Sequence, residues 1–91
     1  MAGRPLPVDP ARLRRQFPAL TDDDIAAFEE VTSRILAEDR PESRARITRE
    51  IVAQGRRARE RAAAGETISA EESLAARYVA SVEKMQAPTA G

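Results

Sequence analysis

Residues 21–38 read TDDDIAAFEEVTSRILAE, and this stretch decides the fold class. Thr21 has the side chain of a helix N-cap, and three aspartates follow it where the helix dipole favours negative charge. At 100° per residue, the apolar side chains fall within a wedge of about 140°. They are Ile25, Phe28, Val31, Ile35 and Leu36, together with Thr32. The pattern predicts an amphipathic helix over 22–38.

Towards the N-terminus, proline marks both ends of a shorter helix. Asp9 followed by Pro10 is typical of an N-cap and a first helical position, which predicts a helix over 10–17 that Pro18 ends. The prolines within residues 1–8 favour an extended arm there.

Two more helices are predicted towards the C-terminus. Pro41 and Gly65 bound a helix over 41–64, about 35 Å long at a rise of 1.5 Å per residue. Ser69 and Glu72 have the spacing of a capping box, which predicts a last helix over 70–86.

No segment shows the strict alternation of a half-buried strand, so the predicted fold is all-α. We expect a small antiparallel helical bundle of one short and three longer helices with an extended N-terminal arm. It would form a single domain over 1–91, with 1–8 and 87–91 flexible.

The chain has little to build a core with. It has 91 residues and a 42% share of apolar residues, but 18 of these are alanine. A single core is marginal in a chain this short, so association with a second copy or another protein is expected. The interface predicted for it is the apolar stripe of the third long segment, which begins bulky and becomes small: Ile47, Ile51, Gly55, Ala58 and Ala62.

The formal net charge is zero, but the charges are segregated along the chain. Residues 21–39 sum to −6 and residues 40–61 to +5. We expect an acidic helix and a basic helix to orient each other, within one chain or between two copies.

The basic segment raises an alternative, binding of an anion or a nucleic acid through Arg56, Arg57 and Arg61. The arginines of residues 56–61 spread over more than half of the helix circumference, and no aromatic residues lie among them for base stacking. The zero net charge also differs from that of a typical nucleic-acid binder. These features favour a solvated or ion-paired face.

The chain contains few of the residue types that bind metals or carry out catalysis. The chain has no His and no Cys, and the adjacent carboxylates of residues 22–24 point about 100° apart on a helix, so they do not converge on one ion. Lys84 is the only lysine, and the four glycines are isolated from one another. We therefore expect no metal, no cofactor and no enzymatic activity, unless a pocket shifts the pKa of a carboxylate.

No apolar run approaches the ~18 residues of a membrane span, and the start, MAGRPLPVDP, lacks the apolar core of a secretory signal. Together with the absence of cysteine, this predicts a cytoplasmic protein away from membranes. The function expected is that of a small interaction or accessory protein that self-associates or binds a protein partner through helical faces.

Overall fold

The computed structural model describes residues 9–86, so the two predicted flexible ends, 1–8 and 87–91, lie outside the described residues. Four helices make up this part of the chain: α1 (Pro10–Gln16), α2 (Asp22–Leu36), α3 (Pro41–Ala63) and α4 (Ala70–Gln86). No strand occurs between residues 9 and 86. The all-α fold class and the small helical bundle are confirmed.

The helices begin at the predicted residues because the predicted caps form. Thr21 and Asp24 make a reciprocal capping box at the start of α2, with hydrogen bonds of 3.0 and 3.1 Å. Ser69 and Glu72 do the same at the start of α4, at 2.8 and 3.1 Å. Asp9 accepts a hydrogen bond from the N–H of Ala11 at 3.1 Å. These side chains satisfy N–H groups that the first helical turn leaves unpaired.

Three helix ends, those of α1, α2 and α3, differ slightly from the prediction. α1 ends at Gln16 because Phe17 precedes a proline and adopts φ −132° and ψ 78°, outside the helical region. α3 ends at Ala63, and Gly65 follows with φ +89°. The N–H of Gly65 bonds to the carbonyl of Ala62, and that of Glu66 to the carbonyl of Arg61, which together make a Schellman motif.

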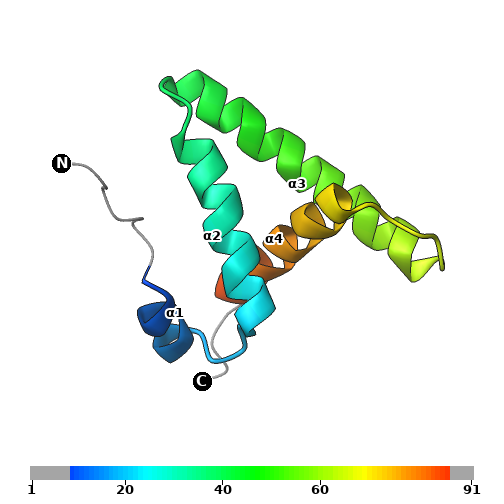
Figure 1. Cartoon of the computed structure of the whole chain (residues 1–91), viewed down its shortest axis with the longest axis horizontal. Coiled ribbons are helices and arrows are strands. Elements are labelled where there is room, and N and C mark those ends of the chain that lie inside the picture. The colour runs from blue at the N-terminus through cyan, green and yellow to red at the C-terminus, as the bar shows by residue number, and fades with distance from the viewer. Residues whose placement is uncertain (1–8, 87–91) are drawn as a thin grey trace.

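The helix α4 holds the fold together. Figure 1 shows α2 and α3 diverging from their short connection, with α4 lying across both of them. The packing of α4 against α3 and against α2 is extensive, whereas α2 and α3 touch each other little. As expected for the longest helix, α3 extends past the crossing with α4 at both ends (Figure 1).

The core lies where α4 meets the other two long helices. Val31 of α2 and Ala58 of α3 are each 1% exposed, and Ser81 of α4 is fully buried, with its hydroxyl donating to the carbonyl of Tyr78. The rings of Phe28 and Tyr78 stack with their centroids 5.9 Å apart. The buried hydrophobic residues are Leu20, Ile25, Ala27, Val31, Ala58, Ala75, Tyr78 and Val79.

Within one chain, the expectation that the acidic and basic helices orient each other is wrong, whereas pairing between two copies stays a prediction. Within residues 9–86, no ion pair joins α2 to α3, and both helices pair with α4 instead. The pairs are Arg34–Glu71, Asp23–Arg77 and Asp24–Lys84 for α2, and Arg59–Glu83 and Arg61–Glu72 for α3. The physical reason is that α2 and α3 diverge, while α4 carries both signs of charge between them.

None of the helices within residues 9–86 combines the length and the apolar character that a bilayer span requires.

Candidate interaction surface

The small end of the predicted interface stripe lies inside the molecule. Gly55 is buried, and a Cβ atom built on it would lie 2.6 Å from Cγ2 of Val79 and still closer to the carbonyl oxygen of Ala75. Ala58, one turn further along α3, is 1% exposed. The close approach that the small residues permit is therefore made by α4 of the same chain.

The other members of the stripe keep some exposure. Ile47 and Ile51 are half-buried, and Ala62 is exposed. The five residues predicted as an interface therefore do not form one free surface, because α4 occupies its middle.

A more exposed apolar surface lies between the diverging parts of α2 and α3. Its inner end closes on a cavity of about 10 Å³, lined by Val31 and Ile51 among others, which holds one water molecule at most. Ile35 lies one turn after Val31, and Ile47 one turn before Ile51, and both are half-buried. We call Ile35, Leu36, Ile47 and Ile51 the α2–α3 apolar surface.

Arg44 connects the start of α3 to the end of α2 and the residues that follow it. Its Nε donates to the carbonyl of Glu38 at 2.7 Å, and its guanidinium also reaches the carbonyl of Leu36 at 3.4 Å. The carbonyl of Leu36 belongs to the end of α2, where backbone acceptors lack partners within the helix and a cation is favoured, and that of Glu38 follows two residues later. The helix α2 ends at Leu36 in place of residue 38, where the N–H of Glu38 bonds to the carbonyl of Ile35 in a tightened last turn.

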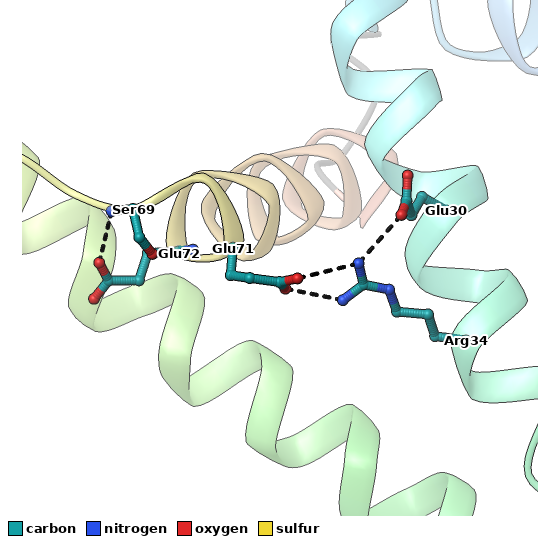
Figure 2. Close-up of polar contacts among 5 residues, drawn as sticks. All are labelled: Glu30, Arg34, Ser69, Glu71 and Glu72. Carbon is teal, nitrogen blue, oxygen red and sulfur yellow. Dashed lines mark hydrogen bonds and ion pairs between the residues drawn. The ribbon is translucent and has the colours of Figure 1, made fainter.

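An ion-pair cluster closes the other edge of this surface (Figure 2). Arg34 of α2 bonds to both carboxylate oxygens of Glu71, at 3.0 and 3.4 Å, and to Glu30 at 3.2 Å. The hydrogen bond that Arg34 donates to Glu71 is the main cause that raises the pKa of Arg34, and the same bond lowers the pKa of Glu71. The cluster joins the first turn of α4 to the outer half of α2.

Of the three residues predicted as an anion site, Arg61 forms ion pairs, and the other two form none with the residues that the structure describes. Arg61 pairs with Glu66 at 2.9 Å and with Glu72 at 2.5 Å, and Glu72 also caps α4 (Figure 2). Arg56 and Arg57 are exposed and form no ion pair within residues 9–86. Arg61 is therefore committed to the α3–α4 connection, and only the other two remain available to an anion.

The aspartates of residues 22–24 have three separate cationic partners. Asp22 pairs with Arg14, Asp23 lies 3.9 Å from Arg77, and Asp24 lies 2.5 Å from Lys84. Between residues 9 and 86, no group of three or more acidic side chains is placed to hold a metal ion.

Asp24 and Tyr78 are the buried ionisable groups of the core. Burial raises the pKa of Asp24, but hydrogen bonds from Lys84 and Thr21 outweigh it, so that the net shift is downward. Burial raises the pKa of Tyr78. Both shifts move the titration further from neutral pH, whereas general acid–base catalysis there needs a pKa near 7.

Most of the larger apolar residues remain partly exposed to solvent. Of the 17 Leu, Ile, Val, Phe, Met and Tyr residues between 9 and 86, five are buried, 11 are half-buried and Leu36 is exposed. Sequence reasoning identified most of their helical faces but not which faces remain uncovered.

Comparison with known proteins does not assign the chain to a group: no protein family, no curated protein and no solved structure matches it.

Proposed function

We propose that this chain is a small cytoplasmic interaction protein that self-associates through helical faces and has no catalytic activity of its own. One observation carries the proposal. Twelve of the 17 larger apolar residues between 9 and 86 are half-buried or exposed, among them the four of the α2–α3 apolar surface. Removing such area from water is worth ~25 cal/mol per Å², and a second copy supplies the covering surface.

The lack of catalytic activity is supported by the titratable groups. The buried carboxylate of Asp24 is neutralised by Lys84, and its pKa is shifted away from neutral. Asp24 and Lys84 are each other's ion-pair partners, so neither side chain is left to act on a substrate.

The alternative, binding of an anion or a nucleic acid, is supported by the exposed, unpaired Arg56 and Arg57 described above. Arg61 does not support this alternative, because its guanidinium pairs with Glu66 and Glu72. If the basic helix is only a solvated face, duplex DNA or RNA binds no tighter than ~10⁻⁴ M at physiological salt.

Sedimentation equilibrium on the full chain tests the proposal. We expect association in the micromolar range, weakened at least ~10-fold by Leu36→Gln together with Ile47→Gln, because these changes make the apolar surface polar. Ala45→Gln, at an exposed position of α3 away from Ile47, is the matched control and should leave association unchanged. A monomer of ~10 kDa at high micromolar concentration would refute self-association.

A further inference from the structure

Four arginines lie on the side of α3 that faces away from α4: Arg46, Arg49, Arg56 and Arg57. All are exposed, and none forms an ion pair within residues 9–86. At 100° per residue they share, with the exposed Ala53, an arc of about 100° opposite the buried Gly55 and Ala58. Within residues 46–57 no acidic residue falls inside this arc. We call these five residues the outer face of α3.

The outer face of α2 carries the opposite charge. Steps of three or four residues place five residues on the side away from the buried Ala27 and Val31, next to the buried Ile25. Four of them are exposed, and Glu29 is half-buried. The face contains the one larger apolar side chain that residues 9–86 expose, which is 41% exposed. The five residues are Asp22, Ala26, Glu29, Ser33 and Leu36.

The two faces match in spacing as well as in charge. Asp22 and Glu29 are seven residues apart, as are Arg49 and Arg56, which is about 10.5 Å along either helix. An alanine follows the first member of each pair by four residues, at Ala26 in α2 and at position 53 in α3. With the two alanines in contact, Glu29 lies opposite Arg56. Asp22, which also pairs with Arg14 of its own chain, lies opposite Arg49.

We propose that a second copy of this chain binds with the outer face of its α3 along the outer face of α2. The inference rests on the proposed self-association, and of the α2–α3 apolar surface this contact covers Leu36 alone. In this register Leu36 lies near Ala63 of the second copy, so that the exposed leucine is covered while the charges pair. If both helices of each copy take part, the contact occurs twice about a two-fold axis.

The charges on the outer face of α3 favour a second copy of the chain over a nucleic acid as its partner. Glu42 and Glu60 continue the outer face of α3 at its two ends and Glu50 borders it, so the basic charge is confined to residues 46–57 and does not continue along the helix as a track for a phosphate backbone would. The matching acids are on the same chain, at the same spacing. Exposed ion pairs are individually weak and are screened by salt, so this association should be micromolar or weaker and fall as ionic strength rises.

Charge reversal provides the test. The variant Arg49→Glu with Arg56→Glu places glutamates opposite Asp22 and Glu29. The variant Asp22→Arg with Glu29→Arg places arginines opposite Arg49 and Arg56. By sedimentation equilibrium, each alone should dissociate at least ~10-fold more readily than the parent chain, because like charges meet. An equimolar mixture of the two should recover the association, because every contact between unlike copies is again complementary.

Two variants with four substitutions each distinguish the effect of charge pairing from the effect of net charge. The net charge is zero in both variants and in the parent chain. The first combines all four reversals, so that each of the two facing charge pairs is complementary again with its signs exchanged, and association should return towards the parent value. The second combines Asp22→Arg and Glu29→Arg with Arg12→Glu and Arg15→Glu on α1, so both faces stay basic and association should stay weak. Circular dichroism checks that each variant keeps its helices.

The outcomes are distinct. A parent chain that stays monomeric refutes both this contact and the proposed self-association. Association that is insensitive to the reversals, or equal in the two variants with four substitutions, refutes this contact but leaves the proposed function in place. Micromolar binding of duplex DNA or RNA that the Arg49 and Arg56 reversals abolish, with self-association unchanged, would assign the stripe to nucleic acid and overturn the proposal.

Discussion

Nζ of Lys84 lies 2.5 Å from Oδ2 of Asp24 and joins the last turn of α4 to the first turn of α2. The same carboxylate accepts a hydrogen bond from the N–H of Thr21 at 3.0 Å. One side chain therefore caps α2 and anchors α4, across 60 residues of sequence.

Lys84→Met should lower the free energy of unfolding, because it leaves the carboxylate of Asp24 buried without its cation. The side chain of Asp24 is 10% exposed and that of Lys84 36%, so solvent screens part of the pair, and we expect a loss of about 1–2 kcal/mol. Urea denaturation measures it. Arg56→Met, which removes an exposed unpaired cation, is the control, and an equal loss there would contradict the role of the pair.

Stability should change little between about pH 5 and pH 9, because the folded protein shifts the pKa of Asp24 down and that of Tyr78 up. The lowered pKa of Asp24 stabilises the fold above its unfolded value of 3.8, and this contribution is lost as pH falls through the folded value. The raised pKa of Tyr78 lowers the stability of the fold only when the pH rises above its usual value of 10.0. Thermal denaturation across pH checks this, and a sharp transition near pH 7 would contradict it.

Gly55→Ala should destabilise the fold, although alanine is the better helix former by ~1 kcal/mol. The added Cβ would overlap the backbone of Ala75 and the side chain of Val79, and backbone cannot move aside as a flexible side chain does. We expect a net loss of about 1–3 kcal/mol, as for other overpacked sites. Stabilisation by this change would show that α3 and α4 do not cross here.

Gly65→Ala serves as the comparison, since no atom lies within 4 Å of a Cβ at that position. Its cost should come from the positive φ of 89° and amount to about 1 kcal/mol. Gly65→Asn should recover part of that loss, because asparagine tolerates this conformation, whereas Gly55→Asn should be worse than Gly55→Ala.

Arg44→Met should cost about 1 kcal/mol, because two carbonyls at and just after the end of α2 lose a charged donor while the aliphatic stem is kept. Arg46→Met, two residues away at an exposed position without an ion pair, should change the free energy of unfolding by less than ~0.5 kcal/mol. Chemical denaturation of the two variants side by side distinguishes them, and equal values would remove the capping role of Arg44.

The sequence by itself determined the helices and where each of them starts. Thr21 with Asp24, Pro41, Gly65 and Ser69 with Glu72 act on backbone groups within a few residues, so these signals can be interpreted without the rest of the chain. The apolar wedge of α2 was likewise visible, because helical periodicity specifies which residues share a face.

Tertiary structure alone decided which faces are covered and by what. Periodicity placed Gly55 and Ala58 on one stripe, but it did not indicate that α4 of the same chain would occupy that stripe. It also did not divide the arginines of α3 into paired ones, such as Arg59 and Arg61, and the unpaired outer set. Both outcomes depend on the angles at which the helices cross, and those angles are set by contacts between residues far apart in sequence, as between Asp24 and Lys84.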